Sequence, residues 1–102
     1  MLEPLTPSAA KATIVRCLDD GVVSFSSHAL DEMRTDGITE DEVRGVLRGG
    51  VVEPAEFENG SWRYRVSIAA ARGRLLSVTY AVVAFRSEIS TIVVTAWRRK
   101  RR

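Results

Sequence analysis

The chain has 102 residues, of which 45% are hydrophobic and 27% are charged. This composition excludes intrinsic disorder, and the length gives room for one hydrophobic core. The single cysteine, Cys17, excludes an internal disulfide and is typical of a reducing compartment. No apolar stretch approaches the ~20 residues that a membrane-spanning helix needs. We therefore expect one cytoplasmic domain over residues 1–102, with no membrane segment.

The net charge of +2 is distributed unevenly along the chain. Residues 1–59 carry five basic and twelve acidic side chains, a net charge of −7, whereas residues 60–102 carry ten basic side chains and one acidic side chain, a net charge of +9. Arginine supplies thirteen of the fifteen positive charges, and its planar guanidinium suits phosphate well. The asymmetry predicts that the C-terminal half meets a polyanion or an acidic protein. Alternatively, two oppositely charged layers attract each other within the domain.

Residues 1–50 carry the signals of three helices. Each predicted helix begins at a capping residue and ends at glycine: Thr6 to Gly21, Ser26 or Ser27 to Gly37, and Thr39 to Gly49-Gly50. The third start is the clearest, because Thr39 and Glu42 have the spacing of a capping box. Residues 22–25, between the first two helices, are predicted to be a short extended link.

From Val51 onward the hydrophobic pattern changes to a period of two, which indicates strands. The candidate strands are 51–58, 61–69, 75–84 and 89–98. Their connections are short, and Asn59-Gly60 is a strong hairpin signal. We therefore predict an α+β fold in which N-terminal helices (1–50) pack on one face of a four-stranded antiparallel sheet (51–98), followed by a basic tail (99–102).

The alternation also predicts which side chains the helices cover. Apolar side chains are assigned to the covered face: Trp62, Tyr64, Val66 and Ile68 in the second strand, Leu76, Val78, Tyr80 and Val82 in the third, and Ile92, Val94 and Ala96 in the fourth. Polar side chains and one tryptophan are assigned to the open face: Arg63, Arg65, Ser67, Ser77, Thr79, Thr91, Thr95 and Trp97. That open face is the predicted site.

The residues on this face suit phosphate chemistry without a metal or other cofactor. No ligand spacing typical of zinc and no phosphate-binding glycine loop occurs. Cleavage of RNA through its 2′-hydroxyl needs a base, an acid and cations around the phosphorus. Arg63 and Arg65, with Arg98 or Arg99 at the end of the sheet, are the predicted cations, and Thr79 and Thr95 are further candidate RNA contacts. Trp97 is the candidate for stacking a base.

His28 is the candidate base or acid, because histidine ordinarily titrates near neutrality. Its predicted place in the first turn of the second helix favours the neutral imidazole, which accepts a proton. Each of these assignments has a structural alternative. His28 would then only help to start the helix, the arginines would be a solvated sheet face, and Trp97 would be a packing residue.

Several short motifs occur between Phe25 and Trp97: Ser27-His28-Ala29-Leu30, Met33, Gly37-Ile38-Thr39-Glu40-Asp41-Glu42-Val43, Val46-Leu47, Trp62-Arg63-Tyr64-Arg65-Val66 and Val93-Val94-Thr95-Ala96-Trp97. In these motifs the stretch resembles a bacterial family labelled domain of unknown function 4258. The layout is also similar to toxins of the BrnT, MqsR and RelE kinds. This resemblance implies a RelE-like sheet whose open face cleaves messenger RNA, usually on the ribosome, and which an antitoxin blocks. It also implies arginine at two places where this chain has Glu32 and Asp36.

The leading hypothesis is therefore a metal-independent endoribonuclease, the toxin of a bacterial toxin–antitoxin pair, with RNA and an acidic antitoxin as partners. The alternative is a non-catalytic module that uses the same basic face to bind RNA or an acidic protein. A third hypothesis is self-association, in which the basic sheet meets the acidic helices of a second copy.

Overall fold

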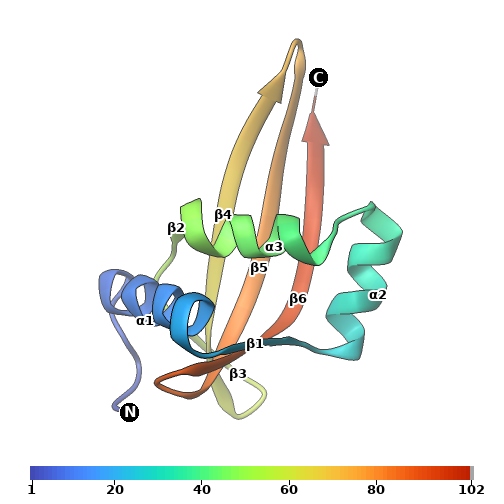
Figure 1. The fold of residues 1–102 in the computed structure, drawn as a ribbon. Coiled ribbons are helices and arrows are strands. Elements are labelled where there is room, and N and C mark those ends of the chain that lie inside the picture. Colours follow the sequence, from blue (N-terminus) through green and yellow to red (C-terminus); the bar gives the residue numbers. More distant parts are fainter. Residues whose placement is uncertain (102) are drawn as a thin grey trace.

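The computed structural model describes residues 1–101, which form an α+β fold of helices and one main sheet (Figure 1). The helices are α1 (Pro7–Asp20), α2 (Ser27–Asp36) and α3 (Glu40–Gly49). The strands are β1 (Val22–Phe25), β2 (Val51–Val52), β3 (Glu56–Glu58), β4 (Ser61–Arg72), β5 (Leu75–Ser87) and β6 (Ser90–Arg101). None of these helices has the length and apolar character needed to cross a membrane.

The three predicted helices are confirmed, together with the residues that start them. The hydroxyls of Thr6 and Ser26 accept hydrogen bonds from the amides three residues ahead, which satisfies one free N–H at each helix start. Thr39 and Glu42 form the predicted capping box at the start of α3. Gly37 ends α2 with a φ of 67°, a left-handed conformation that glycine adopts without a steric penalty.

The predicted four-stranded antiparallel sheet is wrong, because the sheet has six strands and is mixed. Its order is β1-β6-β5-β4-β2, and β3 pairs with β4 off this path. Residues 22–25, expected to be a link, form β1, which pairs in parallel with β6. The predicted strand 51–58 is divided into β2 and β3 around Pro54, since proline cannot donate a backbone hydrogen bond. β6 continues to Arg101, so most of the predicted tail is strand, and residue 102 lies outside the described residues.

The predicted faces are correct for β4 but wrong for β5. In β5 the helix-covered side chains are Thr79, Ala81 and Val83, all of them buried. The pairing of β4 with β5 sets Val82 opposite Arg65, so Tyr80 and Val82 share the face of the arginines. The open-face position predicted for Thr79 is therefore also wrong.

In β6, Thr95 and Trp97 lie on the open face as predicted, but Thr91 is buried. The change of face has a local cause. The register of β5 and β6 shifts between Val82 and Val83, because β6 has one extra residue there and forms a bulge. An extra residue inverts the alternation beyond it, which a regular period of two does not anticipate.

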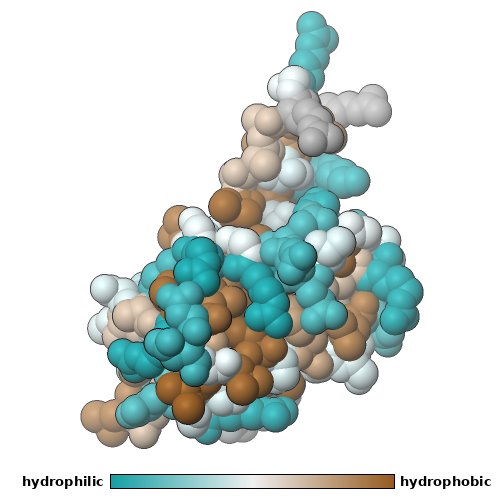
Figure 2. Space-filling model, in the orientation of Figure 1, coloured by the Kyte–Doolittle hydropathy of each residue, from teal (hydrophilic) through white to brown (hydrophobic). Residues whose placement is uncertain are grey.

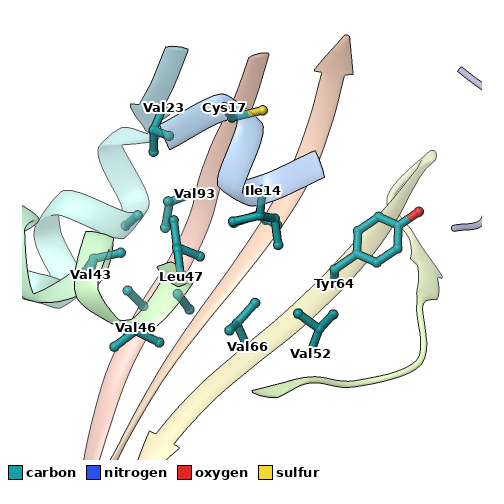
Figure 3. Close-up of a cluster of buried hydrophobic side chains, with 14 of the residues drawn as sticks. Ile14, Cys17, Val23, Val43, Val46, Leu47, Val52, Tyr64, Val66 and Val93 are labelled. Atoms are coloured by element: carbon teal, nitrogen blue, oxygen red, sulfur yellow. The ribbon is translucent and has the colours of Figure 1, made fainter. Parts of the chain in front are cut away.

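The core fills the space between the sheet and the two helices α1 and α3, which cross the same face (Figure 1). Figure 3 shows Ile14 and Leu47 of these helices with Tyr64 and Val66 of β4. Cys17 is buried beside them, and burial raises the pKa of its thiol. α2 packs beside β6 at the margin of the sheet and adds the buried side chains of Ala29 and Met33 to this core (Figure 1).

The phenol of Tyr64 joins this core to the N-terminal segment. Its ring is fully buried, and its hydroxyl accepts a hydrogen bond from the Leu5 amide at 2.9 Å and donates one to Glu3 at 2.8 Å. Burial is the main reason that the pKa of Tyr64 is raised to about 12. The neutral phenol is therefore the form that the folded state favours.

We expect Tyr64→Phe to lower the free energy of unfolding by roughly 1–2 kcal/mol, because the Leu5 amide loses its partner. Because folding raises this pKa, the contribution of the neutral phenol is complete below pH 10 and is lost as the pH rises toward 12. The variant should therefore lose less stability than the parent across that window. Urea unfolding at several alkaline pH values measures both effects. Tyr80→Phe is the control, and an equal alkaline loss in the parent and in Tyr64→Phe would contradict the assignment.

Candidate nucleic-acid interface on the open sheet face

The face of the sheet turned away from α1 and α3, called the open face below, gathers arginine, aromatic and hydroxyl side chains from three adjacent strands. Its members are Arg63, Arg65, Tyr80, Val82, Thr95, Trp97 and Arg99. The strand register builds it in rows: Ser67, Tyr80 and Trp97 lie side by side. Arg65, Val82 and Thr95 form the neighbouring row.

An aromatic pair forms the middle of the open face. The rings of Tyr80 and Trp97 are stacked, with centroids 4.8 Å apart and planes inclined by 9°. The guanidinium carbon of Arg65 lies 5.7 Å from the centroid of the Tyr80 ring, and that of Arg99 lies 5.9 Å from it. Both distances fall within the range of cation–π contacts. The result is a pair of rings that cover one face of each other, with positive charge beside the Tyr80 ring.

Beside this aromatic pair lies a pocket of about 220 Å³. It is lined by Glu53, Pro54, Glu56, Glu58, Arg63, Arg65, Val82, Thr95 and Trp97. Three carboxylates and two guanidiniums therefore surround a space of small-ligand size, with Trp97 as one wall. Carboxylates are proton acceptors and guanidiniums bind phosphate oxygens, so the pocket holds both kinds of group that phosphate chemistry uses.

Arg65 is committed to an internal ion pair. Its Nε donates to Glu53 at 2.6 Å and one terminal nitrogen donates to the second carboxylate oxygen at 2.8 Å. The hydrogen bond from Arg65 holds the pKa of Glu53 below its usual value. The other terminal nitrogen of Arg65 keeps its donors, so this guanidinium can contact phosphate through one edge only. Arg63 makes no ion pair within residues 1–101 and donates to Ser61 at 3.4 Å.

Arg98 and Thr79 lie on the helix-covered side of the sheet, apart from the open face. The Nε of Arg98 donates to the Thr79 hydroxyl at 2.9 Å, and its guanidinium pairs with Glu42 of α3. The Arg98 hydrogen bond is the main reason that the pKa of Glu42 is lowered. This pair therefore anchors α3 to the sheet, and the structure does not bring it together with Arg63 and Arg65.

His28 also lies away from the pocket of the arginines. It is exposed on α2, with its Nε2 3.3 Å from Glu32. It lines a separate shallow depression with Asp31, Glu32, Thr35 and Asp36. Glu32 also accepts a hydrogen bond from the Thr95 hydroxyl, so Thr95 is the only link between this depression and the pocket among the described residues. The structure thus separates the predicted base from the predicted cations.

Comparison with protein-family models places the sequence of this chain in a known family. Residues 25–98 match the family described as domain of unknown function DUF4258. The chain belongs to this family. The predicted membership is confirmed, whereas no curated protein and no solved structure matches the chain. The likeness to BrnT, MqsR and RelE toxins gains no support from these comparisons.

In this DUF4258 domain, Glu32 and Asp36 have a structural role at the margin of the sheet. The carboxylate of Glu32 accepts a hydrogen bond from the amide of Ala96 at 3.2 Å, and that of Asp36 accepts one from the amide of Arg98 at 2.9 Å. Both amides belong to the outer edge of β6. The two acids, which stand where the family resemblance implied arginine, therefore supply hydrogen-bond acceptors to a strand edge.

The sequence reasoning missed several residues of the site. It assigned Tyr80 and Val82 to the covered face, and it did not name Glu53, Glu56 and Glu58. For Glu56 the sequence did carry a signal, which is the pair Asn59-Gly60. In the structure these two residues have φ values of 49° and 81° and form a two-residue hairpin turn. Such a turn sets Glu56 directly opposite Arg63, as the structure shows. The position of Glu56 opposite Arg63 could thus have been predicted from the turn alone.

We expect the ion pair of Arg65 with Glu53 to stabilise the fold above the ordinary glutamate pKa of 4.5 and to be lost as the pH falls through the lowered pKa of Glu53. Between about pH 5 and pH 3, the free energy of unfolding should therefore fall less in Glu53→Gln than in the parent protein. Urea unfolding at successive pH values measures this slope. The matched control is Glu58→Gln, which alters the same pocket without removing an ion pair of the described residues. A slope that is the same for both variants would refute the assignment.

Proposed function

We propose that this DUF4258 domain binds single-stranded RNA on its open face. The observation that carries the proposal is the stacked Tyr80–Trp97 pair with the guanidiniums of Arg65 and Arg99 at its margin. Aromatic platforms bind single-stranded nucleic acids because every base has a face that stacks. Bases in a duplex are already stacked, so such a platform favours unpaired segments.

The charges around the platform favour a phosphate backbone over an uncharged ligand. Arg99 makes no ion pair within residues 1–101, and the same is true of Arg63 beside the pocket. These two guanidiniums and the unused edge of Arg65 would hold phosphates while bases stack near Trp97. The acids of residues 53–58 lower the net positive charge of the open face. It would therefore bind RNA more weakly than a cluster of arginines without acidic neighbours.

A second candidate function is cleavage of the bound RNA, as the endoribonuclease hypothesis expects. The supporting observation is that Glu56 and Glu58 line the pocket with Arg63 and make no ion pair within the described residues. A carboxylate would take the proton of the 2′-hydroxyl, whose oxygen then attacks phosphorus and displaces the 5′-oxygen. The products are a 2′,3′-cyclic phosphate and a 5′-hydroxyl, which receives its proton from a general acid. Arg63 would stabilise the charge that develops on the phosphate.

We expect Trp97→Ala to weaken binding of a fluorescent oligouridine by about 1–3 kcal/mol, which is roughly fivefold to 140-fold, because one stacking surface is lost. Fluorescence anisotropy at one fixed salt concentration measures the affinity. The control is Phe57→Ala, since Phe57 is 62% exposed but packs on Trp62 at the opposite face. Equal losses in both variants, or none in either, would rule out the platform.

Cleavage is tested by inducible expression in bacteria, with growth and new RNA 5′ ends followed in the same culture. The nuclease hypothesis expects growth arrest and new 5′-hydroxyl ends within messages. It also expects both effects to vanish when Arg63 and Arg65 are replaced by Ala together in a protein that still folds. Intact RNA and normal growth with soluble protein that still binds oligouridine would leave the binding module as the function.

A further inference from the structure

The two long edges of the sheet differ in how much of their length is covered by other segments. The outer edge of β6 is covered by β1 and then by the acids of α2. The outer edge of β4 is covered only in its first half, because β3 pairs with residues 61–63 and β2 reaches no further than Ser67. No described segment pairs with the edge beyond Ser67. We call residues 68–71 the edge segment.

The backbone groups of the edge segment point alternately toward β5 and away from it. The carbonyl of Arg65 points outward, since it accepts a hydrogen bond from the amide of Glu53 at 2.9 Å. Because backbone groups alternate along a strand, those of Ala69 and Ala71 also point outward. Ala70 lies opposite Ser77 and directs its groups toward β5. The edge segment therefore offers a short ladder of free N–H and C=O groups.

The side chains of the edge segment do nothing to block strand pairing. The sequence Ile68-Ala69-Ala70-Ala71 has no charge, proline or glycine, and all four residues are exposed. Natural proteins usually protect an exposed edge with lysine, proline, a bulge or a covering element. The end of β6, by comparison, carries cationic residues at its own edge. Figure 2 shows the projecting part of the molecule with apolar surface along its β4 side.

The surroundings of the edge segment are cationic. Residues 61–87 contain no acidic residue, and Arg74 lies in the turn at the tip of the β4–β5 hairpin. On the helix-covered side a depression of about 500 Å³ adjoins the segment. It is lined by Glu42, Ala70, Ala71, Leu75, Ser77, Arg98 and Lys100. Glu42 is paired with Arg98, so Lys100 is left as a cation without an ion pair within residues 1–101.

We propose that an extended, acidic segment of a partner protein adds as a strand along β4 at residues 68–71. Its backbone would bond the outward groups of Ala69 and Ala71. Its acidic side chains would lie near Arg74 and would be attracted by Lys100 across the depression. Alanine side chains leave room for larger residues of the added strand on both faces. A second copy is disfavoured, because it would bring the same cationic hairpin against itself. This contact goes beyond RNA binding and uses a different surface.

The experiment uses the full chain and a short capped peptide in which Glu and Val alternate, with a Lys–Val peptide for comparison. We expect the acidic peptide to bind roughly tenfold more tightly than the basic one, because the charges around the edge are complementary. Hydrogen exchange should slow at the amides of Ala69 and Ala71 and change little at Ala70, which already faces β5. NMR measures the affinity by titration with each peptide, and it measures the exchange rates of the amides with and without the peptide.

Ala71→Pro removes one outward N–H and should weaken peptide binding about fivefold. The matched control Ala71→Val keeps the N–H and should leave the affinity within about twofold of the parent. Equal binding of both peptides, protection elsewhere in the chain, or insensitivity to Ala71→Pro would overturn the proposal. So would a dimer in light scattering that Ala71→Pro dissociates, since the edge would then belong to a second copy.

Discussion

The outer edge of β6 is the constraint on which the arrangement of the N-terminal half depends. Its backbone groups need partners, and the chain supplies them in order of sequence. Val22–Phe25 pair in parallel with Ser90–Val93, Ser26 bonds the next carbonyl groups through its amide and hydroxyl, and α2 provides Glu32 and Asp36. Four residues of helix rise ~6 Å, while two residues of strand span ~6.7 Å. Two acids at this helical spacing therefore meet alternate amides of one strand.

Some of the opposite charges of the two halves of the chain form ion pairs with each other within the fold. The ion pairs of Arg65 with Glu53 and of Arg98 with Glu42 each join the cationic half to the acidic half. The interpretation that two charged layers attract each other therefore accounts for part of the asymmetry. It does not account for Arg99, whose guanidinium lies over an aromatic ring of the open face. Arg63 also lines the open face, and Arg74 lies at the tip of the β4–β5 hairpin. These are the two surfaces for which we propose partners.

The helices were predictable because their signals are local. The capping box joins Thr39 and Glu42, which are three positions apart, and each glycine ends the helix that directly precedes it. The parallel pairing of β1 was not predictable in this way, since its partner is nearly 70 residues away and its four residues carry no turn signal. Long-range pairing depends on what the rest of the sheet leaves unpaired.

The position of Tyr80 was predictable, but from the hairpin and not from hydrophobicity. Across a hairpin with an even number of turn residues, even-numbered residues lie opposite odd-numbered ones. Arg65 must then lie opposite an even-numbered residue of β5, and the structure sets it opposite Val82. The polarity of β5 misled the assignment because both of its faces are apolar. Register is the stronger constraint in such strands, since a slip of one residue inverts every side chain.

The acids of α2 also decide how RNA would approach the open face. Asp31, Glu32 and Asp36 surround the depression that holds His28, and Arg34 is paired with Asp31. Three carboxylates repel phosphate, so the side of the sheet next to α2 would exclude a nucleic-acid backbone. The backbone would instead run along Arg63 and the Tyr80–Trp97 pair toward the end of β6. On that proposed path His28 would have no part in the chemistry, and any proton transfer would fall to the carboxylates that line the pocket.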